Sequence, residues 1–133
     1  MSPRKVNREG RQRRILRKAA DLFAERGYDG VTMRQVAHAL KCSTGALYHF
    51  FPSKEALFRG CVRQAAERGM ARARVVVDRQ HEPVQQIMAL AQHYLSSDDE
   101  HERLVMLMVA AAQSQSRRIR TETVSEVLDE EVA

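Results

Sequence analysis

The stretch from residue 32 to residue 57, TMRQVAHALKCSTGALYHFFPSKEAL, constrains the fold most strongly, because three helix-start signals follow one another within it. Thr32 stands at a predicted N-cap, and Gln35, three residues later, completes a capping box. Ser43 and Ser53 are the predicted caps of two further helices. Two short helices joined by a tight turn predict a helix-turn-helix, whose second helix fits the major groove of DNA.

The two short helices each have one apolar side. In the first, Val36, Ala37 and Leu40 recur at helical spacing and leave a polar, basic side outside. The second spans residues 44–50 and is too short to be stable alone. We therefore expect it to dock on its neighbours through Leu47.

The residues around the predicted turn, on all three helices, match the sequence pattern of a known protein family. A first helix ends in FAERGYDG, the segment VTMRQVA follows, and the next two helices contribute Ser43, Gly45, Leu47, Tyr48, Phe51, Lys54, Glu55 and Leu57. Together these residues closely resemble the DNA-binding domain of the TetR family of bacterial transcriptional regulators, over about residues 11–57. One position departs from the family pattern. Lys41 lies where the turn usually has glycine, and a positive φ there would strain it by roughly 1 kcal/mol.

The resemblance implies an all-α fold. An N-terminal three-helix helix-turn-helix bundle would be joined by a long connector helix to a C-terminal helical ligand-binding and dimerisation domain. The expected parts are a flexible basic arm over residues 1–10, the DNA-binding domain over 11–57, the connector over 58–80 and a partial regulatory domain over 81–133. Family members continue for several more helices, so the C-terminal domain is expected to be truncated, as a shortened product or as a short variant.

The C-terminal part contains three predicted helices. One begins at Pro83, which suits a first helical turn, and residues 96–99 end it. The next contains LVMLMVAAA, which is apolar on every side and is therefore predicted to be buried all round. Because little chain remains to cover it, we expect its face around Leu104 to Val109 to lie under a partner chain or a rearranged core. A last amphipathic helix is predicted over residues 119–132.

Charge is divided unevenly along the chain. Residues 1–80 carry 18 Lys and Arg against 7 Asp and Glu, a balance of +11, whereas residues 81–133 carry 4 against 10, a balance of −6, and the two sum to the net charge of +5. The basic half contains the predicted helix-turn-helix. A positive surface favours nucleic acid, because neutralising phosphates releases counterions. The alternative interpretation is a basic, solvated surface without a partner.

Motifs for catalysis, metal binding and membrane insertion are absent from the sequence. The two cysteines lack CxxC spacing, the five histidines form no HExxH or HxxxH pair, and there is no Gly-rich phosphate loop or GxSxG. The acidic cluster at residues 98–102 is typical of a solvated cap and not of paired catalytic acids. No apolar signal segment follows the basic N-terminus, and the longest apolar run, residues 104–112, is too short to cross a bilayer. We therefore expect a cytoplasmic protein that is not an enzyme and carries no metal or cofactor.

The family pattern places the predicted DNA contacts on the second short helix and beside it. The predicted set is Thr32, Arg34, Ser43, Thr44, Gly45, Tyr48, His49 and Lys54. Thr44, Gly45, Tyr48 and His49 fall on the groove-facing side, and none of them is the Arg or Asn that usually pairs with a specific base. Sequence preference is therefore expected to depend on DNA shape. A core aromatic is the alternative for Tyr48, and a solvated charge is the alternative for Lys54.

The resemblance also implies a ligand-sensing module in the second half. Family members hold a small, often apolar effector among these helices and release DNA when it binds. The candidate lining residues are Met88, Ala91, Tyr94, Leu104, Met108 and Val109. Methionine and aliphatic residues at helical spacing are more often an ordinary core, which is the alternative interpretation.

These expectations combine into one functional hypothesis. The chain is predicted to be a DNA-binding transcriptional regulator, a repressor that binds a palindromic operator as a homodimer and is released by a small-molecule effector. The alternative is a shortened interaction protein that heterodimerises with a full-length regulator and antagonises it.

Overall fold

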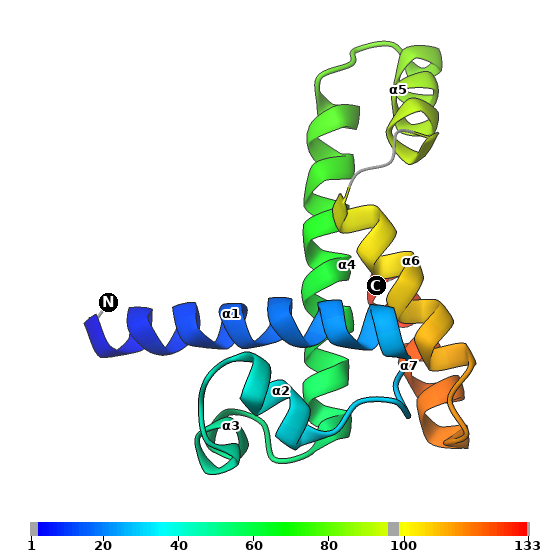
Figure 1. Ribbon diagram of the computed structural model, residues 1–133. Helices are drawn as coiled ribbons and strands as arrows, with labels where there is room; N and C mark the ends of the chain where they lie inside the picture. The colour runs from blue at the N-terminus through cyan, green and yellow to red at the C-terminus, as the bar shows by residue number, and fades with distance from the viewer. Residues whose placement is uncertain (1–2, 96–98, 133) are drawn as a thin grey trace.

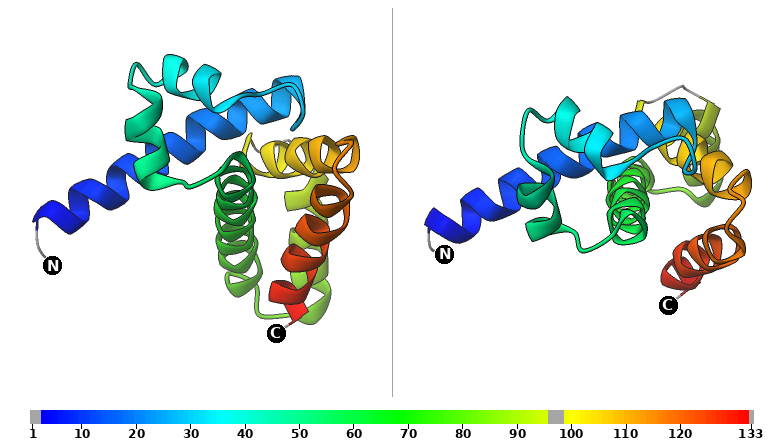
Figure 2. Two further views of the ribbon diagram at one scale, coloured as in Figure 1. Left: turned by 90° about the horizontal axis from the view of Figure 1, so that it is seen from below. Right: turned by 60° about the horizontal axis from the view of Figure 1, so that its bottom comes forward.

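The computed structural model describes residues 3–95 and 99–132, and its regular structure over these residues is entirely helical (Figure 1). The helices are α1 (Pro3–Arg26), α2 (Met33–Ala39), α3 (Thr44–Phe50), α4 (Lys54–Asp78), α5 (Pro83–Leu95), α6 (Asp99–Ala112) and α7 (Arg117–Val132). The predicted all-α fold is confirmed. Figure 2 shows α2 and α3 on one side of α4, and α6 and α7 on the other. No helix of the described segments is both long enough and apolar enough to span a bilayer.

Helix α1 is longer than predicted. It begins at Pro3, so the flexible arm expected over residues 1–10 is wrong from Pro3 onward, and the two residues before it lie outside the described part of the chain. Pro3 suits a first helical turn, and the Arg, Lys and Glu residues that follow are good helix formers. They compensate for Gly10, which costs about 1 kcal/mol relative to Ala. The Arg8 guanidinium also lies 5.4 Å from the centroid of the Phe50 ring, which fastens this end of α1 to α3.

The predicted starts of α2, α3 and α4 are confirmed. The N–H of Gln35 donates to Thr32 Oγ1 at 3.1 Å, and the N–H of Thr32 donates to Gln35 Oε1 at 3.0 Å, which completes the capping box. Ser43 Oγ accepts a backbone N–H of α3 at 3.1 Å, and Ser53 Oγ accepts one of α4 at 3.0 Å. Each cap satisfies an N–H group that a helix start leaves without a helical partner.

The turn between α2 and α3 places Lys41 at a φ of 57°, in the left-handed region that glycine prefers. The N–H of Lys41 donates to the His38 carbonyl at 3.0 Å, and the N–H of Cys42 donates to the Ala37 carbonyl at 3.0 Å. These two bonds form a Schellman motif, which ends α2 and fixes the direction of the turn. The strained lysine expected at this position is confirmed.

Lys41→Gly should stabilise the protein by about 0.5–1 kcal/mol. The change relieves a left-handed strain of about 1–2 kcal/mol and loses about 0.5–1 kcal/mol in backbone entropy, and the Lys41 side chain is exposed. The free energy of unfolding in urea measures the difference. Gly27→Ala at the end of α1, where φ is 77°, is the mirror control and should destabilise the protein. A Lys41→Gly variant that is less stable than the wild type would contradict this account of the turn.

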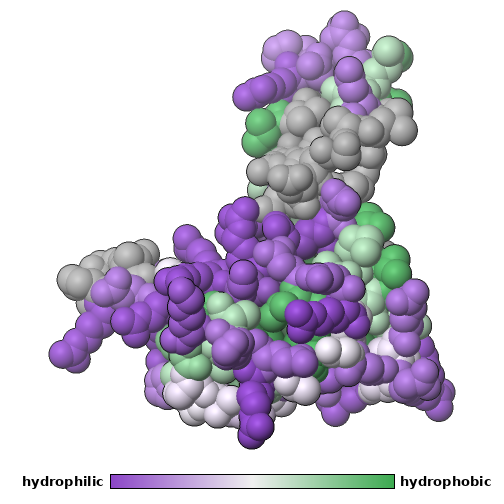
Figure 3. Space-filling view, in the orientation of Figure 1, coloured by the Kyte–Doolittle hydropathy of each residue, from purple (hydrophilic) through white to green (hydrophobic). Residues whose placement is uncertain are grey.

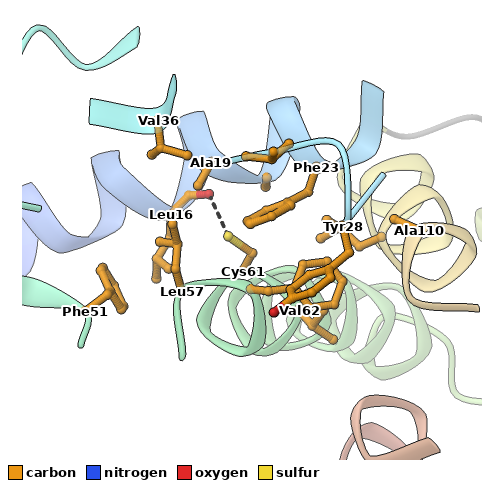
Figure 4. Close-up of a cluster of buried hydrophobic side chains, with 14 of the residues drawn as sticks. Leu16, Ala19, Phe23, Tyr28, Val36, Phe51, Leu57, Cys61, Val62 and Ala110 are labelled. Atoms are coloured by element: carbon orange, nitrogen blue, oxygen red, sulfur yellow. Dashed lines mark hydrogen bonds between the residues drawn. The ribbon is translucent and has the colours of Figure 1, made fainter. Parts of the chain in front are cut away.

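The core lies where α1, α2, α3 and α4 meet, and it continues into α6 and α7 (Figure 4). Phe23, Tyr28 and Phe58 form an aromatic cluster, in which ring centroids are 5.0 Å apart for Phe23 and Phe58 and 5.1 Å apart for Tyr28 and Phe58. Leu107 of α6 and Ile119 of α7 are fully buried in the same core. The helix-turn-helix, α6 and α7 therefore share one hydrophobic core.

Helices α1 and α4 cross closely at Gly60. A Cβ atom added there would lie 2.8 Å from Leu16 Cδ2 and 3.3 Å from the Phe51 ring, so the absent side chain permits the close contact. One residue further on, the Cys61 thiol donates to the Leu16 carbonyl at 3.3 Å (Figure 4). Burial raises the pKa of the Cys61 thiol, so this cysteine is a packing residue and not a reactive one.

Helix α6 has only one buried side. Leu107, Ala110 and others on that side pack against α1 and α4, whereas Val105, Met106 and Val109 are 48%, 39% and 40% exposed. The expectation that this helix is buried all round is therefore wrong within this chain, because its second side has no helix of the described chain over it. Cover by a partner chain stays a prediction.

Polar contacts tie the loop between α1 and α2 to the turn between α6 and α7. The Asp29 carboxylate accepts the Ser114 hydroxyl at 2.8 Å and the Gln115 N–H at 2.7 Å. The Arg120 guanidinium donates to the Ser114 carbonyl at 2.6 Å and braces the same turn. The N–H of Gln115 and the hydroxyl of Ser114 hold the pKa of Asp29 below its usual value. The charged form of Asp29 is thus the form that joins the two segments.

Asp29→Asn should lower stability near neutral pH, and the difference from the wild type should shrink in acid. A carboxylate with a folded pKa below its unfolded value, about 3.9, binds fewer protons when folded. Its stabilisation is therefore present above that value and is lost as the pH falls through the folded pKa. The free energy of unfolding of both proteins, measured from neutral pH into acid, tests the prediction. Asp78→Asn, at the exposed end of α4, is the matched control. A gap that stays constant into acid would rule out the charged contact.

Candidate nucleic-acid interface

Helix α3 turns one side to the core and the other to solvent. Leu47 is fully buried and Phe50 packs against the core, whereas Gly45 and His49 are exposed and Tyr48 is 49% exposed. Docking of this short helix through Leu47 is confirmed. The alternative of Tyr48 as a core aromatic is wrong, because half of the side chain is exposed at a position about 100° around the helix from the buried Leu47.

Hydroxyl groups border the starts of α2 and α3. Thr32 and Ser43 are exposed N-caps whose oxygens already accept a backbone N–H, and Thr44 lies half-buried in the first turn of α3. A hydroxyl that accepts one hydrogen bond keeps its own O–H to donate. The two caps, and the exposed Arg34 that follows Thr32 by two residues, therefore offer donors suited to phosphate oxygens.

Lys54 is held in place by the loop that precedes α2. Its Nζ donates to the Tyr28 carbonyl at 3.0 Å and lies 4.2 Å from the centroid of the Tyr28 ring. The alternative of a purely solvated charge is therefore wrong. Sequence reasoning missed this contact, because its partner is a backbone carbonyl that any residue could supply. An ammonium group has three N–H donors, and the Tyr28 carbonyl accepts only one of them. The others can still donate to a phosphate, and this contact stays a prediction.

The surface around α3 is rich in positive charge. The exposed basic residues of α1, α2 and the turn include Arg4, Arg8, Arg11, Arg14, Arg34 and Lys41. Figure 3 shows one face of the molecule, on which hydrophilic side chains cover much of α1. Binding of a polyanion such as DNA to such a surface is favoured by the entropy of the counterions that it releases.

Across the described residues, no group of three or more His, Cys, Asp or Glu side chains could hold a metal ion.

The candidate effector residues are not gathered into one enclosed site by the described side chains. Leu104 and Met108 are half-buried against the core, whereas Met88 on α5 is 67% exposed and Val109 faces solvent. The other two candidates, Ala91 and Tyr94, have side chains outside those that the structure describes. Two of the four described candidates therefore lack the burial that an enclosed ligand site needs.

Known proteins match the same helix-turn-helix segment. Residues 15–61 match the bacterial regulatory proteins of the tetR family. The chain is 38% identical to the HTH-type transcriptional regulator UidR of Escherichia coli (strain K12) over 68 residues. This aligned segment is 51% of this chain and 35% of UidR. The chain is also 31% identical to the HTH-type transcriptional repressor KstR2 of Mycobacterium tuberculosis over 103 residues. This aligned segment is 77% of this chain and 52% of KstR2.

Solved structures share the fold over most of the described chain. The structure of the ketosteroid transcriptional regulator KstR2 of Mycobacterium tuberculosis has a TM-score of 0.72 at 29% identity and covers 92% of this chain and 61% of KstR2. The structure of AibR in complex with isovaleryl coenzyme A and operator DNA has a TM-score of 0.70 at 23% identity and covers 90% of this chain and 69% of AibR. The second likeness shows the fold alone.

The matches agree on one segment and one fold. The chain spans about a third to a half of the curated relatives that it matches. These relatives are regulators and repressors of transcription, not enzymes. The capped α2 and α3, the residues matched by the family and the shared fold lead to one conclusion: the chain belongs to the TetR family of bacterial regulatory proteins.

Proposed function

We propose that this chain is a transcriptional repressor whose helix α3 enters the major groove of an operator. The observation that carries the proposal is a capped helix that is buried through Leu47 and exposes Gly45, Tyr48 and His49. Thr44 and His49 would hydrogen-bond base edges or phosphates, and Gly45 would let the backbone approach closely. The Tyr48 hydroxyl would donate to a phosphate while its ring lies on the duplex.

Contacts beside α3 would position it without reading sequence. Thr32, Arg34 and Ser43 would donate to phosphates, and Lys54 would add a charge near the backbone. The groove-facing residues hold no Arg or Asn, the usual partners of guanine and adenine. The operator preference would therefore come partly from DNA shape and deformability.

The repressor would act as a homodimer on a palindrome in the bacterial cytoplasm. Two copies of α3 must then lie about one helical turn of DNA apart, roughly 34–36 Å or slightly more. The exposed side of α6, with Val105, Met106 and Val109, supports this proposal, because a second chain can remove that apolar surface from water.

A small, apolar effector would release the operator. KstR2 is a ketosteroid transcriptional regulator, so ketosteroids are the first compounds to test. Helix α4 begins at Lys54, shortly after α3 ends, and runs into the C-terminal region. An effector seated near Leu104 and Met108 would pivot α4 and change the separation of the two α3 helices.

Selection from a random duplex library should enrich a palindrome. The measurement is sequencing of the bound DNA, followed by the mass of the complex in solution, and two chains per duplex are expected. A chain that stays monomeric and binds every duplex weakly at moderate salt would contradict the proposal. It would favour the shortened interaction protein that pairs with a full-length regulator.

Thr44→Ala and Tyr48→Phe should weaken operator binding in different ways. Removal of the Tyr48 hydroxyl eliminates one phosphate hydrogen bond and should weaken binding about fivefold on every duplex. Removal of the Thr44 hydroxyl should change the ranking among duplexes that differ in the groove under α3. Fluorescence anisotropy with a panel of selected duplexes separates the two effects. Equal weakening by both variants on all duplexes would count against groove reading by Thr44.

A further inference from the structure

The N-terminal half of α1 reaches beyond the hydrophobic core. Ile15 is the first buried side chain of α1 among the described residues, yet the helix begins at Pro3. Figure 2 shows this end of α1 projecting past α3. Core packing therefore does not account for residues 3–14.

Arginines occupy the side of α1 that faces α3. Positions 4, 8, 11 and 15 recur at helical spacing, so their side chains lie along one side of the helix. Ile15 is buried there, and Arg4, Arg8 and Arg11 precede it. The Arg8 guanidinium lies 5.4 Å from the centroid of the Phe50 ring, which shows that this side meets α3. Where the stripe leaves the core, it changes from apolar to cationic.

A hollow lies between this arginine stripe and α3. Its lining residues come from two helices and are Arg4, Asn7, Arg8, Arg11, Ala46, His49 and Phe50. No carboxylate side chain lines the hollow. Like charges at this spacing repel one another. An anion bound in the hollow would relieve that repulsion.

We propose that Arg4, Arg8 and Arg11, together with His49, bind phosphates of the DNA backbone beside the groove that α3 enters. The inference rests on the proposed function, because His49 belongs both to the hollow and to the exposed side of α3. A cation–π contact with a ring uses none of the N–H donors of a guanidinium, so those of Arg8 can still donate to phosphate oxygens. These arginines stand on a helix and not on a flexible arm, so less conformational entropy is lost when they bind.

The phosphate binding would be independent of sequence and would lengthen the protected segment of DNA. The experiment uses the full chain and the selected operator, and it compares Arg4→Gln/Arg8→Gln with Arg13→Gln/Arg17→Gln. Arg13 and Arg17 are exposed on α1 about half a turn away from the stripe, so the control removes the same charge from the same helix. Affinity is measured against salt concentration, on the natural duplex and on duplexes with neutral methylphosphonates at single flanking positions.

The stripe variant should bind about tenfold more weakly, and its slope of log K against log salt should fall by about 0.9 for each phosphate that the variant no longer neutralises. The control should change far less, because charges beyond about 8 Å are screened at physiological salt. Methylphosphonates at the phosphates that the arginines bind should weaken the wild type and leave the stripe variant unaffected. Equal behaviour of the two double variants, or a wild type indifferent to every flanking methylphosphonate, would overturn the inference alone. Failure of the wild type to select any duplex would overturn the proposed function itself.

Discussion

Burial of Leu47 is the interaction on which the proposed DNA-reading surface depends. Helix α3 has seven residues, well below the length at which an isolated helix is stable in water. Full burial of one leucine side chain contributes roughly 1.5–3 kcal/mol, and the Ser43 cap adds about 1 kcal/mol. Once Leu47 is buried, the helical period places Gly45 and His49 on the opposite side of α3 and Tyr48 about 100° from Leu47, and all three are exposed. The exposure of the side chains proposed to meet DNA is thus a consequence of core packing.

The loop between α1 and α2 connects this surface to the rest of the chain. Lys54, the first residue of α4, donates to the carbonyl of Tyr28, and the neighbouring Asp29 accepts hydrogen bonds from the turn between α6 and α7. Ion pairs between Arg103 and Asp21 at 3.1 Å and between Arg59 and Glu122 at 2.6 Å join the same helices, although exposed pairs contribute little alone. This loop is therefore a second connection, besides α4, between the helix-turn-helix and the C-terminal helices.

Local signals predicted what local physics controls. The Thr32, Ser43 and Ser53 caps and the strained Lys41 follow from residues within one or two turns, and the structure confirms each of them. The prediction of a flexible arm was wrong over the first turns of α1, because the contact that holds them, Arg8 on Phe50, joins residues that are distant in the sequence. The all-apolar run of α6 indicated burial but could not indicate how many sides this chain covers. The Asp29 contact likewise depends on a turn that approaches only after folding.

The central claim, that the exposed side of α3 lies in the major groove, is tested most directly by a cleavage reagent tethered to that helix. An iron chelate attached through Ala46→Cys, in a Cys42→Ser background, leaves the buried Cys61 unlabelled. Addition of peroxide should cut the selected operator within the major groove at two positions, one in each half-site. The same chelate placed through Val84→Cys on the exposed side of α5 should leave the operator intact. Absence of cleavage from α3, or equal cleavage from both helices, would contradict the account.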